Sequence, residues 1–252
     1  MTTVESKFMA IEAKIAAVWE TILRTSRLAQ AIQSGEFSKE LYMIYMLETY
    51  HYTSHNARNQ AVVGVEHPEN PVYMKFCFEH AADEAGHEMM ALHDLKSIGR
   101  SAEELDIPLP LPATETLIAY LYWVSKSGNP FRRLGYSLWA ESSYKYINPL
   151  VAKVKERLAL SNNQLTFFVA HSDIDDVHAA DVKKIIERVC RTEEDWLAVA
   201  EVAVTSLRLT GRMLDEVHDE YIALMAKQPS RYSLARDQLF SAESLSPAES
   251  TV

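Results

Sequence analysis

Hydrophobic residues recur along most of the chain with the three-to-four-residue spacing of amphipathic helices. Charged residues or histidines interrupt every apolar run before the roughly 20 residues that a membrane-spanning helix requires. The pattern predicts an all-α protein of about seven helices. Their predicted ranges are 4–33, 38–64, 71–98, 113–127, 131–158, 163–189 and 193–226.

Helix-start signals support three of these boundaries. Ser38 precedes a Lys-Glu pair, Asn70 precedes a proline, and Thr192 precedes three acidic residues. These side chains can accept hydrogen bonds from the unpaired N–H groups of a first helical turn. We therefore expect helices to begin immediately after each of them.

Other segments predict a bend and two stretches without helix. Pro149 removes one backbone hydrogen bond and should bend or split its helix after Tyr146, close to Glu141. The proline-rich stretch 100–116 predicts a long connection across the outside of the bundle. The Ser-, Ala- and Pro-rich segment 227–252 predicts a flexible tail after a single helical domain, 1–226.

Composition narrows the class of protein. The 252 residues are 48% apolar with only 7 Gly and 9 Pro, which favours long helices in one domain. A formal charge of −10 opposes binding to nucleic acid or to an anionic membrane surface, so neither partner is expected. Cys77 and Cys190 form no CxxC pair, and the N-terminus lacks the apolar stretch of a secretory signal. We expect a soluble protein of the reduced cytoplasm.

The sharpest local pattern lies in the segment AHSDIDDVHAADV. His171, Asp175 and His178 stand at i, i+4 and i+7, so their side chains fall within an arc of roughly 60° and span about 10 Å along a helix. Imidazole and carboxylate ligands together suit iron, manganese or zinc. A solvated helix face is the alternative, because Asp173 and Asp176 are charged neighbours.

The segment FEHAADEAGHEMM carries a second candidate pair. Glu84 and His87 form Glu-x-x-His, which places a carboxylate and an imidazole on one helix face, as in carboxylate-bridged di-iron bundles. His80 and three acidic residues crowd the same segment. An exposed amphipathic helix therefore explains the pair equally well.

Two further glutamates have apolar surroundings. Glu48 lies in LYMIYMLETYHYT and Glu141 in YSLWAESSYKY, where the flanking residues should face inward. A buried carboxylate is costly unless it is paired or metal-bound, and partial exposure is the alternative. Together with the two histidine motifs, these glutamates let four predicted helices each present a carboxylate. This is the arrangement of carboxylate-bridged di-iron bundles.

The segments ETYHYTSHN, DEAGHE, AESSYKY and HSDIDDVH, in this order, resemble the heme-oxygenase-like diiron oxidases and oxygenases, also called the iron-containing redox enzyme family. The similarity covers approximately residues 38–180, and His-x-x-x-Asp-x-x-His is its most specific part. The resemblance implies a heme-oxygenase-like bundle that uses two Fe(II) ions, with O2 as co-substrate. Relatives include an alkene-forming fatty-acid decarboxylase, amino-acid oxidative-cleavage enzymes and N-oxygenases.

Residue by residue, the resemblance implies a metal-ligand set of Glu84, His87, Glu141, His171, Asp175 and His178. Glu48 matches an earlier carboxylate that family members use less uniformly, and we expect it to take part in catalysis. A substrate carboxylate would need a cation, for which Lys145 and Arg58 are candidates, with surface placement as the alternative for both.

The implied activity oxidises a small aliphatic or amino-acid-like substrate by desaturation, oxidative C–C cleavage or N-oxygenation. Its partners are a small-molecule substrate and O2. An external electron donor and a homodimer are both compatible with this activity. The sequence does not choose among the three reactions.

Two other interpretations fit parts of the pattern. A ferritin-like di-iron protein needs the same carboxylates and two histidines, but has no use for His171. A thiaminase-like enzyme or a metal-free small-molecule-binding protein of the heme-oxygenase-like fold is the second alternative. The thiaminase-like enzyme would need a cysteine nucleophile, and neither Cys77 nor Cys190 lies beside a matching base pattern.

Overall fold

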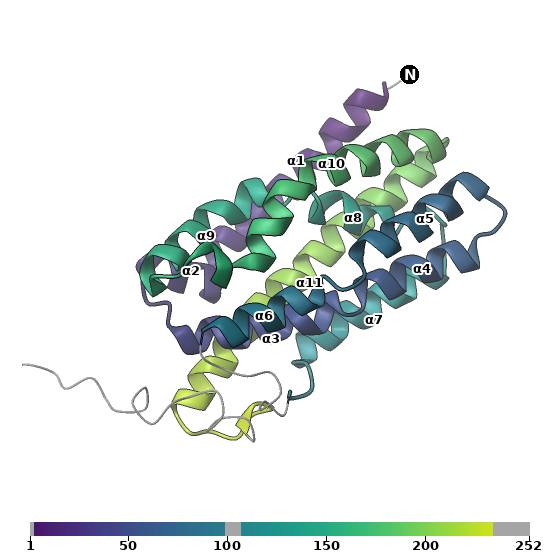
Figure 1. The fold of residues 1–252 in the computed structure, drawn as a ribbon. Helices are drawn as coiled ribbons and strands as arrows, with labels where there is room; N and C mark the ends of the chain where they lie inside the picture. Colours follow the sequence, from purple (N-terminus) through teal and green to yellow (C-terminus); the bar gives the residue numbers. More distant parts are fainter. Residues whose placement is uncertain (1–2, 99–106, 234–252) are drawn as a thin grey trace, which may run out of the picture.

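The computed structural model describes residues 3–98 and 107–233, apart from the side chains of residues 172–177. Every regular element in these ranges is helical, which confirms the all-α prediction (Figure 1). None of these helices is both long and apolar enough to cross a lipid bilayer. The elements are α1 (Val4–Thr25), α2 (Arg27–Ser34), α3 (Lys39–Thr53), α4 (Asn56–Glu66), α5 (Pro71–Glu84), α6 (Glu88–Ser97), α7 (Pro112–Lys126), α8 (Leu134–Ala140), α9 (Tyr144–Leu158), the 3-10 helix η1 (Asn162–Gln164), α10 (Thr166–Val189) and α11 (Glu193–Met225).

The three predicted helix starts carry the caps that the sequence indicates. The Ser38 and Asn70 side chains each accept a hydrogen bond from the backbone N–H three residues later, at the starts of α3 and α5. Thr192 and Asp195 form a reciprocal capping box at the start of α11. Local hydrogen bonds therefore fix where these three helices begin.

The long helix α11 joins the two parts of the core. It contacts α1, α2, α3, α7 and α8 and runs through the middle of the bundle (Figure 1). Val199, Ala203 and Leu207 repeat every four residues and are completely buried, as one inward helix face requires. These residues belong to one apolar cluster, whereas Val217 and Leu224 further along α11 belong to a second.

Four of the seven predicted helices are each broken in two. The breaks lie at Ser26, at residues 54–55, at residues 85–87 and at residues 141–143, so the described chain has eleven α-helices. Gly86 explains the third break, because its φ of +96° is a conformation that L side chains rarely adopt. Neither glycine nor proline marks the second break, and the helical periodicity continues across it.

The predicted position of the bend at Pro149 was wrong. The helix is split at residues 141–143, and α9 then continues through Pro149 to Leu158. Pro149 is the sixth residue of α9, so it removes one interior hydrogen bond without ending the helix. The break beside Glu141 is therefore not caused by the proline.

The chain after α11 packs on the bundle. Tyr232 is completely buried, and its hydroxyl donates a hydrogen bond of 2.6 Å to Glu48 Oε1. Arg231 forms an ion pair of 2.8 Å with Glu115. Packed chain thus continues to at least residue 233, beyond the predicted domain end at 226. The rest of the predicted tail, 234–252, lies outside the described residues.

Glu48 is part of this contact. Its carboxylate is completely buried and also accepts a hydrogen bond of 3.1 Å from the backbone N–H of Leu111, which caps α7. Burial raises the pKa of Glu48 to about 7, although the hydrogen bonds from Tyr232 and Leu111 oppose the shift. Glu48 therefore connects α3 to the start of α7 and to the segment after α11.

At Gly135 the helices α8 and α11 approach too closely for a side chain. A Cβ placed there would lie 2.7 Å from the backbone nitrogen of Ala203 and would also collide with the carbonyl oxygen of Val199. Both are backbone atoms of α11 and cannot rotate away. This crossing sets the position of α8, at whose C-terminal end Glu141 lies.

We expect Gly135→Ala to lower the free energy of unfolding by about 1–3 kcal/mol or more, because the two helix backbones must separate. Gly211→Ala is the matched control, since its Cβ would meet only the side chain of Ile22, at 3.0 Å. That side chain can shift, and alanine favours a helix by about 1 kcal/mol over glycine. Urea unfolding measures both variants, and equal effects would contradict the assigned crossing.

We expect Glu48→Gln to flatten the dependence of stability on pH. The folded-state pKa of Glu48 is raised from 4.5 to about 7, so the folded protein holds this proton more tightly than the unfolded chain. The free energy of unfolding should therefore fall as the pH rises through this window, by on the order of 3 kcal/mol. Urea unfolding at several pH values tests this, and an unchanged slope in Glu48→Gln would refute it.

Candidate metal centre

A tight turn brings Glu84 and His87 together. Glu84 ends α5, His87 precedes α6, and Gly86 forms the turn between them, so the pair does not share one continuous helix face. Asn56 Nδ2 donates a hydrogen bond of 2.7 Å to Glu84 Oε2. Glu84 Oε1 lies 3.6 Å from His87 Nδ1, which is too far for a hydrogen bond. One carboxylate oxygen is thus fixed, and the other faces an imidazole.

The third member of this group comes from α10. The ring of His171 lies with its centroid 4.8 Å from that of His87. Ligand atoms of Glu84, His87 and His171 lie within 4.8 Å of one another. His171 Nδ1 is 2.6 Å from the carbonyl oxygen of Phe167, so Nδ1–H donates and Nε2 is left as the acceptor atom. A backbone carbonyl commonly orients a metal-binding histidine in this way.

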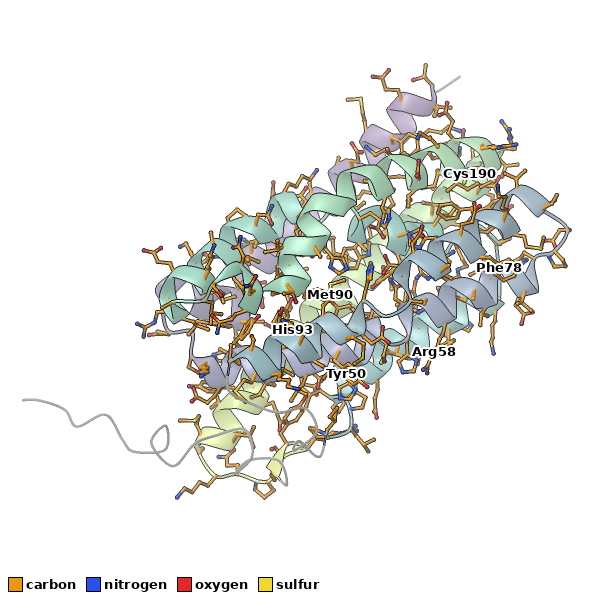
Figure 2. The ribbon with its side chains drawn as sticks, viewed as in Figure 1. Tyr50, Arg58, Phe78, Met90, His93 and Cys190 are labelled. Atoms are coloured by element: carbon orange, nitrogen blue, oxygen red, sulfur yellow. The ribbon has the colours of Figure 1, made fainter. Side chains whose placement is uncertain are left out.

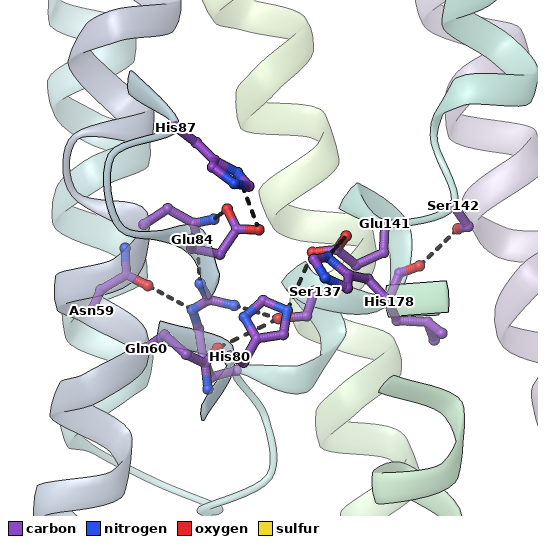
Figure 3. A network of polar contacts seen from close by, with 12 residues as sticks. Asn59, Gln60, His80, Glu84, His87, Ser137, Glu141, Ser142 and His178 are labelled. Carbon is purple, nitrogen blue, oxygen red and sulfur yellow. Dashed lines mark hydrogen bonds and ion pairs between the residues drawn. The ribbon is translucent and has the colours of Figure 1, made fainter. Parts of the chain in front are cut away.

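Glu141 lies between two further imidazoles, at the C-cap of α8. Its Oε1 is 3.3 Å from His80 Nε2, and its Oε2 is 3.5 Å from His178 Nδ1 (Figure 3). His80, Glu84 and Glu141 form a second group whose ligand atoms lie within 4.8 Å of one another. Because Glu84 belongs to both groups, the two groups are contiguous.

These contacts control the charges of the cluster. Burial alone would raise the pKa of Glu141, but the neighbouring imidazoles of His178 and His80 lower it to about 2. In return, the carboxylate of Glu141 raises the pKa of His178 to about 8. Burial lowers the pKa of His171, which favours the neutral imidazole that metal binding needs.

A buried arginine supports Glu84 through Asn56. Arg133 is completely buried and donates a hydrogen bond of 2.8 Å to Asn56 Oδ1, and others to Asn59 and Ser137. This bond fixes the amide orientation of Asn56, so that its Nδ2 points at Glu84. The positive charge therefore reaches Glu84 through one neutral side chain.

The cluster has the properties of a metal site. Nδ1 of His80 and Nδ1 of His87 are buried and have no hydrogen-bond partner among the described residues. Such buried polar atoms are uncommon, and each calls for an explanation such as an ion. Imidazole nitrogens together with carboxylate oxygens suit iron, manganese or zinc. The residues present therefore fit the iron that the sequence resemblance implies.

An apolar cavity of about 150 Å³ opens on the cluster. Glu84, Glu141 and His171 contribute to its polar part. The rest is lined mainly by aliphatic and aromatic side chains of α1, α2, α3, α8, α9, α10 and α11, and includes Trp19 and Leu214. No lysine or arginine is among the described residues that line it.

The structure brings together five of the six residues predicted as ligands, namely Glu84, His87, Glu141, His171 and His178. The side chain of Asp175 lies outside the described residues. His80 was not among the predicted ligands. Its position one helical turn before Glu84 was a signal in the sequence, which charged neighbours obscured.

The residues predicted to act on the substrate lie elsewhere. Glu48 is held by Leu111 and Tyr232 and does not line the cavity. Lys145 is exposed, with its ammonium group over the ring of Tyr146 at 5.0 Å. Arg58 is exposed on α4 (Figure 2). Lys145 lies one helical turn after the candidate ligand Glu141. Its side chain nevertheless points away from the cluster, because its face of α9 is turned to solvent.

Comparison with solved structures defines the fold as heme-oxygenase-like. A domain of unknown function with a heme oxygenase-like fold from Shewanella denitrificans OS217 has a TM-score of 0.86 and 48% sequence identity, over 89% of this chain and 97% of that chain. TenA homologues from P. horikoshii OT3 and from Pseudomonas syringae pv. tomato DC3000 have TM-scores of 0.68 and 0.70 at 16% and 13% identity. They cover 84% and 86% of this chain, and 97% and 96% of their own chains. At these identities they show the fold alone.

The family described as iron-containing redox enzyme matches residues 43–211. The chain therefore belongs to the iron-containing redox enzyme family, as its motifs indicate. No curated protein sequence matched the chain. Because the fold is heme-oxygenase-like, the ferritin-like interpretation is excluded.

We expect Asn56→Ala to weaken metal binding by roughly 10–100-fold, the usual effect of removing a group that orients a ligand. Glu84 would lose its hydrogen bond from Asn56, and Arg133 would lose an acceptor. Asn59→Ala is the matched control, because Asn59 also accepts from Arg133 but does not contact Glu84. Anaerobic Fe(II) titration compares them, and equal affinities would contradict the role given to Asn56.

Proposed function

We propose that this chain is an O2-dependent, non-heme diiron oxidase or oxygenase that acts on a small substrate with an aliphatic or aromatic body. The supporting observation is that the cluster of imidazoles and carboxylates lines an apolar cavity of about 150 Å³. Two Fe(II) ions, when bound, supply electrons for the reduction of O2, which protein side chains cannot do.

Side chains of the cluster would hold the two iron ions, and the cavity walls would shield them from water. Glu84, His87 and His171 are the expected ligands of one ion, and Glu141 and His178, with Asp175, of the other. Asn56 keeps one oxygen of Glu84 occupied and so fixes the direction of the other. The apolar walls limit the water that reaches the ligands, which protects reactive species from side reactions.

The cavity favours a substrate whose enclosed part carries no charge. A carboxylate held by the protein would need a cation, and no described lining residue is a lysine or arginine. Lys145, the candidate cation, is exposed. An aliphatic substrate is therefore favoured over an amino-acid-like one. Removal of hydrogen from carbon, leading to desaturation or C–C cleavage, is favoured over N-oxygenation.

A thiaminase-like activity is disfavoured by the cysteines. Cys77 and Cys190 are both buried, and neither lines the cavity. Burial raises the pKa of Cys77 to about 11 and that of Cys190 to about 12. Both thiols are therefore protonated near neutral pH, whereas a nucleophile must be a thiolate.

We expect anaerobic loading to place two Fe(II) ions on each chain, and subsequent O2 exposure to consume O2 with an absorbance change in stopped flow. Glu84→Ala should lose both properties, because Glu84 contributes to both ligand groups. Glu79→Ala is the control, since Glu79 is exposed on the same helix, α5. Failure of the loaded wild type to react with O2, or full reactivity in Glu84→Ala, would refute the proposal.

A further inference from the structure

Two segments of the chain repeat one order of ligand types at one spacing. The first is His80-x3-Glu84-x2-His87, at the end of α5 and the turn to α6. The second is His171-x3-Asp175-x2-His178, within α10. A histidine thus precedes the carboxylate by four residues and another follows it by three in both segments. By sequence position, His80 corresponds to His171.

The two segments meet in opposite directions. His87, the last member of the first segment, has its ring centroid 4.8 Å from that of His171, the first member of the second. His80, the first member of its segment, has its ring centroid 5.9 Å from that of His178, the last member. The four imidazoles therefore form two pairs, each with one member from either segment.

Each imidazole pair lies beside its own carboxylate. Glu84 lies with His87 and His171, and Glu141 lies within 3.3–3.5 Å of His80 and His178. Figure 3 shows His80 and His178 approaching Glu141 and His87 approaching Glu84. With His80 included, each group therefore consists of one carboxylate and two imidazoles. Without His80, the group around Glu141 has a single imidazole.

The surroundings of His80 do not explain its burial. The residue is 6% exposed, and its Nδ1 has no hydrogen-bond partner among the described residues. Its Nε2 also has no hydrogen-bond partner among the described residues, although it lies 3.3 Å from Glu141 Oε1, and His178 approaches the other oxygen of that carboxylate. A buried imidazole without full hydrogen bonding costs about 1–3 kcal/mol, so a packing role alone would favour an apolar side chain.

We propose that His80 is a metal ligand, which together with His178 and Glu141 completes a second half-site equivalent to Glu84, His87 and His171. This inference rests on the proposed diiron centre and adds a seventh protein ligand to it. It implies that two imidazoles serve each ion. The ion beside Glu141 would then be held about as firmly as the other.

Anaerobic titration with Co(II), followed by visible absorbance and metal analysis, tests the proposal without reliance on turnover. Wild type should bind two ions per chain. His80→Ala should keep one ion and bind the second at least ~10-fold more weakly, because it removes one ligand. His178→Ala should lose the same ion, so the double variant should still keep one.

Two further measurements separate a ligand from a residue that only positions Glu141. His80→Gln keeps a side-chain N–H for Glu141 but has no imidazole, so it should behave like His80→Ala. It also preserves much of the side-chain volume, which makes it the variant to use if His80→Ala does not fold. Added imidazole should restore the second ion to His80→Ala, because it can occupy the vacated space.

His93→Ala is the control, since His93 is exposed on α6 and should leave both ions bound (Figure 2). Two ions at wild-type affinity in His80→Ala, or full binding by His80→Gln, would overturn the assignment of His80. Wild type that binds no metal would instead refute the diiron centre itself. The two failures are therefore distinguishable.

Discussion

The contacts that join Glu141 to His80 and His178 hold a buried charge inside an otherwise apolar bundle. A carboxylate in such a place is costly unless charged or hydrogen-bonded partners surround it. The pKa of Glu141 is lowered to about 2 and that of His178 is raised to about 8, so Glu141 and His178 are both charged near neutral pH. A bound cation would replace the imidazolium charge, so metal binding and proton release at this cluster are linked.

Breaks in the helices bring the carboxylates and imidazoles of the cluster together, so that a metal ion can replace a proton there. Glu84 and His87 flank the turn at Gly86, and Glu141 directly follows α8. At a helix end, a side chain can approach from a direction that a continuous helix face does not provide. Gly135 fixes one of these ends by allowing α8 to contact the backbone of α11. The cavity and the cluster are therefore consequences of interrupted helices.

Periodicity and capping signals in the sequence predicted where most helices begin, but not where they break. At residues 54–55 no glycine or proline interrupts the pattern, but the hydroxyls of Thr53 and Ser54 bond to backbone carbonyls of the preceding turn, which competes with the helical ladder. Gly86 is a clear signal in retrospect, because a positive φ is available to glycine at little cost. Pro149 was misleading, since α9 continues through it.

The same limit applies to the site. Spacing within one helix identified His171 and His178, because both lie on one face of α10. Glu48 has the apolar neighbours that favour a buried ligand, but its partner Tyr232 is 184 residues away in the chain. Helical periodicity carries no information about such a contact. His80 was hidden for the opposite reason, because its charged sequence neighbours lie on the exposed side of α5.

Arg133 shows how the protein balances charge without competing for the ligands. A guanidinium bound directly to Glu84 would occupy both oxygens in a bidentate pair and leave none for a metal. Instead, Asn56 lies between them, accepting from Arg133 at 2.8 Å and donating to Glu84 Oε2 at 2.7 Å. The positive charge is close enough to stabilise the buried carboxylate, yet Oε1 remains directed at the imidazoles. A direct salt bridge would leave Glu84 with no free oxygen for a metal ion.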